Sequence, residues 1–213
     1  YTFTLLILFF CSQLISAQTV TNWYEGKGSA LALTFDDWSP GQEKIAAPTL
    51  IKEKIQGTFF VTSVNIWSNK AYFQMEQLLA NGSEIGNHTK THPQLTSIAN
   101  DQAKLTTEII TTKEVLEKNV SGLNVTIFCY PQGLGPGNKN VENMVKKDHI
   151  AARGIFAPRS RKWSYPINDY YNLPTIAVNK NMTLSLYKNY LQTVQNDGGS
   201  VSYTHLTLPT TPY

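Results

Sequence analysis

Carboxylate and imidazole side chains follow two short apolar stretches of this 213-residue chain. Asp36 and Asp37 come directly after the apolar run at residues 30–35. Adjacent carboxylates repel each other, so such a pair normally needs a cation or a shared proton. His88 and His92 follow a later stretch, and histidines four apart in a helical turn face the same way, so both rings can reach one metal ion. No glutamate follows His88, which excludes the zinc-protease helix.

A third motif, Cys129-Tyr130-Pro131-Gln132-Gly133, ends another β-branched and aromatic run. Pro-x-Gly is typical of a sharp turn, which leaves backbone N–H groups unpaired and pointing outward. Each motif alone has a simpler interpretation. The Asp pair can be a helix cap, the His pair a polar turn, and the Pro-x-Gly segment an ordinary loop.

Short apolar runs alternate with amphipathic stretches along the chain. We expect strands at 30–35, 58–62, 84–86, 125–130, 150–152 and 175–178, and helices at 48–55, 70–81, 101–118, 141–147 and 184–195. This alternation predicts parallel βα units in a sheet or barrel. All three motifs then lie at the C-terminal ends of strands, the edge where α/β barrels assemble their sites. One carboxylate and two imidazoles there form a facial metal-ligand set with open positions, and the second carboxylate is free to act as a base.

The segments Thr34-Phe35-Asp36-Asp37, His88-Thr89-Lys90-Thr91-His92 and Tyr130-Pro131-Gln132-Gly133, in this order, resemble the polysaccharide deacetylase family. Its members are metal-dependent carbohydrate esterases with a nodulation-type deacetylase (NodB) homology domain. The resemblance runs from residue 30 to residue 200. It implies an α/β fold, a distorted (β/α) barrel of about seven strands rather than eight, here incomplete at the C-terminus.

The resemblance also assigns roles to residues. It implies that Asp37, His88 and His92 hold a divalent metal, and that Asp36 is the general base. Zinc is the metal expected first, with cobalt, nickel or manganese as alternatives. The backbone N–H of Gln132 would contact the oxyanion. We expect Trp38, Tyr130 and Pro131 to contact substrate, since aromatic faces suit the C–H faces of sugar rings.

The third motif departs from the family pattern Arg-x-Pro-Tyr-Gly. Cys129 stands where the arginine that partners the base is expected, and Gln132 replaces the tyrosine. Arg153 could supply the missing charge, or it could be a surface residue. His205 lies where the late Leu-x-His motif of the family is expected, but we assign it no role because the residues around it have another explanation. We expect His149, at a helix end, to be structural.

These features predict a secreted, extracellular or periplasmic deacetylase. Its substrates would be N-acetyl groups of a polymer such as chitin or peptidoglycan, or O-acetyl groups of one such as xylan. The alternatives are a non-catalytic carbohydrate-binding protein on the same scaffold and a mononuclear iron oxygenase with the same ligand set. Asp36 argues against the oxygenase, which has no use for a second carboxylate beside its ligand.

The ends of the chain carry separate expectations. Residues 1–17 are typical of a secretory signal without its basic start, because an apolar run is followed by small residues. The alternative, a membrane anchor, needs about 20 apolar residues, so we expect no stable membrane insertion after signal removal. Residues 18–200 form the expected deacetylase domain. Residues 201–213 match the translation of a transposase-type sequencing adapter, so we interpret them as read-through.

Composition limits the remaining classes. Charged residues make up 15% and apolar residues 41%, which is typical of a chain with a sizeable core and not of a disordered one. The net charge of +3 is small and scattered, so nucleic acid is not an expected partner. Two cysteines exclude a disulfide-rich miniprotein and a four-thiolate zinc site. The oligomeric state is left open.

Overall fold

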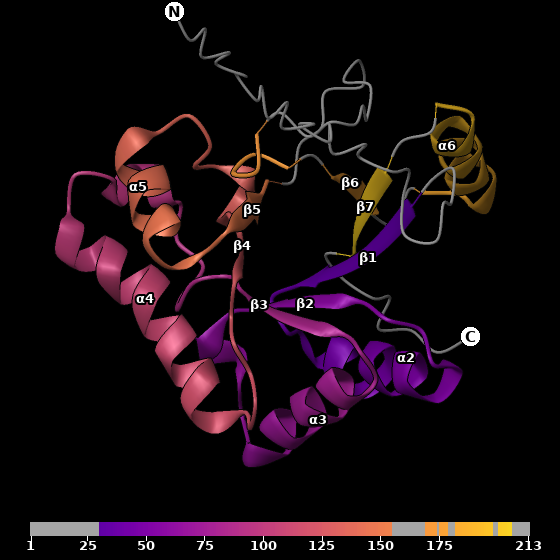
Figure 1. Ribbon diagram of the computed structural model, residues 1–213, viewed down its shortest axis with the longest axis horizontal. Helices are drawn as coiled ribbons and strands as arrows, with labels where there is room; N and C mark the ends of the chain where they lie inside the picture. Colours follow the sequence, from indigo (N-terminus) through magenta and orange to yellow (C-terminus); the bar gives the residue numbers. More distant parts are fainter. Residues whose placement is uncertain (1–29, 155–168, 174, 179–181, 198–199, 206–213) are drawn as a thin grey trace, which may run out of the picture.

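The computed structural model describes residues 30–154, 169–173, 175–178, 182–197 and 200–205. Seven parallel strands form one curved sheet with the order β5-β4-β3-β2-β1-β7-β6. They are β1 (Ala30–Asp36), β2 (Thr58–Val61), β3 (Glu84–Asn87), β4 (Ile127–Cys129), β5 (Ala151–Arg153), β6 (Ile176–Val178) and β7 (Ser200–His205). The sheet curls around the middle of the molecule and the helices lie around its outside (Figure 1). This confirms the expected α/β fold, an incomplete barrel.

Each helix expected from the sequence is present, with small shifts at the ends. The helices are α2 (Ala47–Glu53), α3 (Asn69–Ala80), α4 (Gln102–Asn119), α5 (Lys139–Asp148) and α6 (Leu184–Asp197). Shorter helical turns lie at η1 (Gln42–Ala46), η2 (Ser63–Asn65), η3 (Leu95–Ile98) and η4 (Pro131–Gly133). Three of these turns, η1, η2 and η4, follow the C-terminal ends of strands β1, β2 and β4.

Helix α4 shows how the local sequence builds these elements. The Asp101 carboxylate accepts a hydrogen bond from the Lys104 backbone N–H at 3.0 Å and so caps the first turn. Leu105, Ile109 and Leu116 recur at helical spacing and are fully buried. The helix therefore lies against the sheet along one apolar stripe.

Two apolar clusters fill the space between sheet and helices. One packs β1, β2 and β3 against α2 and α3, with the rings of Phe35 and Phe59 stacked at 4.6 Å. The other packs β4 and β5 against α4 and α5 around Phe128 and Tyr130. Their side chains come from the strands that carry the three sequence motifs, so the core holds those strand ends in place.

Strand β7 was not among the strands expected from the sequence. It pairs with β1 from Ala30↔Ser200 to Phe35↔His205 and with β6 on its other side. The interpretation of residues 201–213 as read-through concerns their origin and stays a prediction. Residues 1–17 and 206–213 lie outside the described residues. None of the described helices combines the length and apolar character that a membrane crossing needs.

Candidate metal centre and active site

The turn after β1 sends its two carboxylates in different directions. Asp37 and Trp38 both adopt left-handed backbone angles, with φ of 81° and 56°. The Asp37 N–H donates to the Phe60 carbonyl at 2.9 Å, and the Asn65 side-chain amide donates to the Asp37 carbonyl at 2.7 Å. Held on both sides, the turn directs the Asp37 side chain toward the histidines and leaves Asp36 in the strand.

The segment carrying the two histidines is a loop, which corrects the helical turn assumed from their spacing. Strand β3 ends at Asn87, and Thr89 and His92 then adopt left-handed angles, with φ of 68° and 60°. The Thr89 hydroxyl accepts a hydrogen bond from the His92 N–H at 3.0 Å. The two imidazole rings end 4.8 Å apart. Backbone reversal, not helical periodicity, brings them together.

Asp37, His88 and His92 converge on one point. Asp37 Oδ1 lies 3.4 Å from His88 Nε2 and 3.5 Å from His92 Nε2. His88 Nδ1 lies 2.8 Å from the Cys129 carbonyl, which can only accept, so Nδ1 carries the proton. In the neutral ring Nε2 then presents a lone pair, yet it is buried and has no hydrogen-bond partner among the described residues. Two imidazole nitrogens and a carboxylate suit zinc and similar divalent ions, so these residues fit a metal.

Burial and neighbouring charges shift the pKa values of Asp37, His88 and His92. Burial raises the pKa of Asp37, but His88 and His92 outweigh it and hold that pKa below its usual value. Burial and the neighbouring His88 lower the pKa of His92. Burial opposes charge on His88, yet Cys129, Asp37 and Asp36 together hold its pKa well above the usual value. A proton and a metal therefore compete for His88 Nε2, and acid weakens metal binding.

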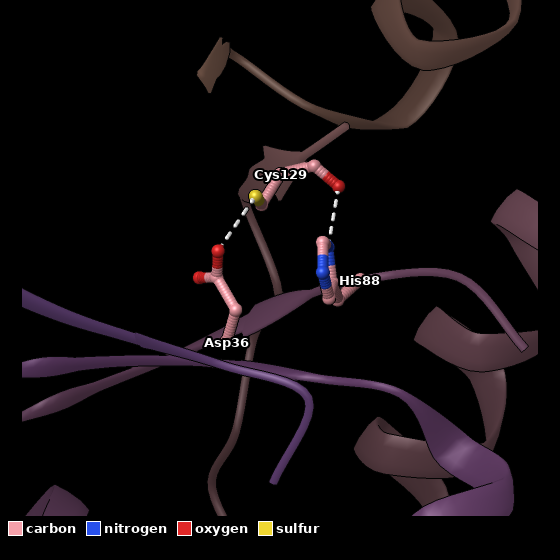
Figure 2. A group of neighbouring side chains, drawn as sticks. All are labelled: Asp36, His88 and Cys129. Atoms are coloured by element: carbon pink, nitrogen blue, oxygen red, sulfur yellow. Dashed lines mark hydrogen bonds between the residues drawn. The ribbon is translucent and has the colours of Figure 1, made fainter. Parts of the chain in front are cut away.

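Asp36 has a different set of partners. Its side chain is fully buried and forms an ion pair with the Arg153 guanidinium, which is also buried. The Cys129 thiol donates to the other carboxylate oxygen at 3.6 Å, as Figure 2 shows. Arg153 reaches Asp36 from β5 with its guanidinium 4.5 Å from the ring centre of Phe60. The structure therefore decides between the two interpretations of Arg153: it is no surface residue, and it supplies positive charge to Asp36.

Asp36, His88 and Cys129 form a second group whose ligand atoms lie close enough to hold an ion (Figure 2). Two observations make it the weaker candidate. The Arg153 guanidinium already neutralises Asp36. Burial raises the pKa of the Cys129 thiol, so the thiolate that a metal would need is disfavoured. The donor chemistry therefore favours the group with Asp37.

The Pro-x-Gly turn after β4 lies beside these groups. Gln132 is exposed and left-handed, with φ of 56°. Its N–H has no partner in the described part of the chain. The preceding Tyr130 N–H donates to the Arg153 carbonyl at 2.9 Å, which fixes the turn to β5. The Gln132 N–H is thus not paired within the described residues, and its contact with an oxyanion stays a prediction.

The side chains expected to contact substrate are instead part of the core. Trp38 is 1% exposed and packs edge-on against Phe59 at 5.5 Å. Tyr130 is 0% exposed and packs so closely on Gly135 that a Cβ there would lie 2.3 Å from its ring. Pro131 is buried as well. Burial leaves no ring face for a sugar, so we correct this expectation: all three serve packing.

Several residues that hold the site were not predicted from the sequence. Asn65 fixes the Asp37 turn, and the Thr62 hydroxyl donates to the His88 carbonyl at 3.1 Å. Asn87 lies beneath the histidine loop with its amide fully buried. Asn87 precedes His88 directly, and this adjacency was the one sequence signal available for it.

Comparison with known proteins decides the family. The polysaccharide deacetylase family model matches residues 24–152. The chain belongs to the polysaccharide deacetylase family. It is 34% identical over 106 residues to the peptidoglycan-N-acetylmuramic acid deacetylase PdaC of Bacillus subtilis (strain 168), a match covering 48% of this chain and 21% of that protein. The chain thus spans about a fifth of the length of this curated relative.

Solved structures share the fold. The deacetylase PplD of Streptococcus pyogenes, in complex with acetate, superposes with a TM-score of 0.60 at 24% identity, covering 76% of this chain and 69% of that one. A family 4 carbohydrate esterase from Bacillus anthracis gives a TM-score of 0.55 at 20% identity, covering 89% and 72%. At these identities the likeness concerns the fold of this deacetylase-family chain.

Proposed function

We propose that this protein is a metal-dependent deacetylase that hydrolyses acetyl groups of a polysaccharide outside the cell, in the extracellular space or the periplasm. The observation that carries the proposal is the buried His88 Nε2 in a chain of this family. This atom has no hydrogen-bond partner among the described residues and lies 3.4 Å from Asp37 Oδ1. N-acetyl groups of peptidoglycan or chitin are the proposed substrates, with O-acetyl groups of a polymer such as xylan second. The name of the Bacillus subtilis relative supports testing peptidoglycan first.

Asp37, His88 and His92 would hold the metal, for which we propose zinc, with cobalt, nickel or manganese as alternatives. A bound divalent ion supplies Lewis-acid polarisation of the acetyl carbonyl and lowers the pKa of water. Asp36 would take the proton of the attacking water. Because Asp36 is fully buried, it can exchange that proton only with water inside the site. The Gln132 N–H would donate to the oxyanion that forms on the carbonyl.

Arg153 weakens the main alternative, a carbohydrate-binding protein without activity. That alternative rested on the cysteine at position 129, where the family pattern has an arginine. A guanidinium that pairs with Asp36 from β5 supplies the same charge to the same carboxylate. The observed pairing favours an enzyme.

The metal site is tested by removing one ligand. We expect His92→Ala to lower the affinity for zinc or cobalt by orders of magnitude, because two remaining donors bind an ion far less tightly than three. Isothermal titration calorimetry of the metal-free protein measures this change. Lys90→Ala, in the same loop but outside the donor set, is the control and should keep most of the affinity. Equal affinity of wild type and His92→Ala would remove this site from the proposal.

The base is tested separately from metal binding. Asp36→Asn keeps the shape of the side chain but removes its basicity, so we expect metal binding to persist while kcat falls about 10²–10⁴-fold. Acetate release from peptidoglycan, chitin oligosaccharides and acetylated xylan, with metal added, measures the activity. Release of acetate from none of the three by the wild type favours the binding protein, and a near-normal kcat in Asp36→Asn places the base elsewhere.

A further inference from the structure

His149 ends helix α5 and lies 2% exposed against the strand that leads into the histidine loop. Its Nδ1 lies 3.1 Å from the Val145 carbonyl and its Nε2 lies 3.1 Å from the Asn87 side-chain nitrogen. A carbonyl can only accept, so Nδ1 carries the proton and Nε2 accepts from Asn87. The ring is thus a neutral histidine with both nitrogens in use.

Asn87 joins this histidine to the loop. Its nitrogen also donates to the Ile109 carbonyl at 2.7 Å, and its oxygen accepts from the Thr89 N–H at 2.9 Å. These two backbone groups fix the orientation of the amide, because one is an acceptor and the other a donor. Since the side chain is fully buried, a missing partner would leave a polar group unsatisfied, which is unfavourable.

The same chain of bonds continues to the outer ligand. Thr89, held by Asn87, accepts from the His92 N–H through its hydroxyl at 3.0 Å. Both Thr89 and His92 adopt left-handed angles that residues with side chains rarely take. Such a conformation persists only where its surroundings enforce it. A continuous path of hydrogen bonds therefore runs from the end of α5 to His92.

We propose that His149 and Asn87 are positioning residues, which hold the loop after β3 in the conformation that presents His88 and His92 to a metal. This inference rests on the proposed metal site, because the loop has a ligand to present only there. His149 touches neither metal ligand and acts through Asn87. Partners of this kind around metal sites typically contribute 10–100-fold to metal affinity.

Two substitutions at position 149 differ in whether the new side chain is long enough to contact Asn87. His149→Gln can place an amide oxygen near the position of Nε2 and accept from Asn87. His149→Asn can keep the local contact with Val145 but ends short of Asn87. We expect amide hydrogen exchange at Thr89 and His92, measured by NMR on the metal-free protein, to speed up at least about tenfold in His149→Asn and little in His149→Gln.

Zinc affinity of the same proteins is the second readout. We expect a loss of about 10–100-fold in His149→Asn and recovery in His149→Gln. Val145→Ala removes buried apolar atoms from the same helix without touching the bonded path, so it controls for general destabilisation.

Unchanged exchange in His149→Asn overturns the inference, and so does an equal loss of zinc affinity in Val145→Ala. Absence of zinc binding by the wild type counts against the proposed function instead. The exchange measurement then still decides whether His149 holds the loop.

Discussion

At the scale of single residues, two adjacent aspartates in this protein contact different groups. Asp36 is the last residue of β1 and faces a guanidinium and a thiol in the core. Asp37 is the first residue of the left-handed turn and faces two imidazoles, the buried ring of His88 and the partly exposed ring of His92. A strand residue and a turn residue point in different directions, which relieves the repulsion that adjacent carboxylates would otherwise suffer.

Moving the arginine that pairs with Asp36 from strand β5 to strand β4 tests whether the strand that supplies the positive charge affects stability and activity. We expect Arg153→Met to leave a buried, unpaired carboxylate, to lower the free energy of unfolding by about 3–5 kcal/mol, and to lower kcat about 10–100-fold. Adding Cys129→Arg to Arg153→Met returns an arginine from the neighbouring strand β4 and should recover much of kcat. Urea unfolding and acetate release measure the two effects.

Cys129→Ala is the control, since it alters the same contact without moving charge. If Arg153→Met keeps both the stability and the kcat of the wild type, the ion pair between Arg153 and Asp36 contributes to neither.

At the scale of elements, strand β3, between β2 and β4, shows how closely the sheet packs beneath the candidate site. A Cβ on Gly86 would lie 2.6 Å from Phe60 Cδ1 and 3.0 Å from Ile127 Cγ1. These atoms belong to side chains of β2 and β4, the strands on either side. Glycine at this position lets the ring of Phe60 cross the strand just before the histidine loop begins.

Gly86→Ala should therefore destabilise the protein. Because the ring of Phe60 is 4% exposed and tightly packed, we expect the free energy of unfolding to fall by about 1–3 kcal/mol. Chemical denaturation measures the change. Gly122→Asn is the control, since nothing lies within 4 Å of a Cβ there and asparagine tolerates its φ of 74°. Equal stability of Gly86→Ala and wild type would show that Phe60 moves aside freely.

At the scale of the whole molecule, elements on the outside of the sheet contact the strand end that carries the candidate site. Helix α5 lies outside the strands, yet the residue at its C-terminal end contacts the amide beneath the histidine loop. Burial lowers the pKa of His149 to about 4; Lys113 lowers it further, while the Val145 carbonyl, Asp148 and Glu117 partly oppose the shift. The imidazole of His149 therefore stays neutral in the folded protein until the pH falls to about 4.

The stability of the fold should respond to acid through this histidine. Between about pH 6.5, the ordinary histidine pKa, and about pH 4, the pKa in the folded protein, the unfolded chain binds the proton and the folded protein does not. The contribution of His149 is thus fully present above the higher value and is lost as pH falls, by up to about 3 kcal/mol. Urea unfolding at several pH values should show a steeper loss in wild type than in His149→Gln. Parallel curves would contradict the low pKa.

The local sequence was sufficient for most of the elements and for the candidate metal ligands. Apolar periodicity, the Asp101 cap and the glycine after α3 depend on neighbours within a few residues, so each helix was predicted to within a few residues. The three motifs follow strands in the sequence, and parallel strands bring such positions to one edge. Residue type and spacing therefore make His88, His92 and one of the two aspartates candidate ligands, and the family resemblance assigns that role to Asp37.

The remaining features depended on tertiary structure. Arg153 lies 117 residues from Asp36 in the sequence, and strands β4, β3 and β2 separate β5 from β1 in the sheet, so only the curvature of the sheet (Figure 1) brings its guanidinium to that carboxylate. Trp38 was expected to contact substrate because it follows Asp37 on the same loop, but a left-handed turn directs its ring into the core. His149 was expected only to end a helix, and its bond to Asn87 exists because α5 packs on the sheet. Burial and long-range pairing are set by how the elements pack, and no local pattern encodes them.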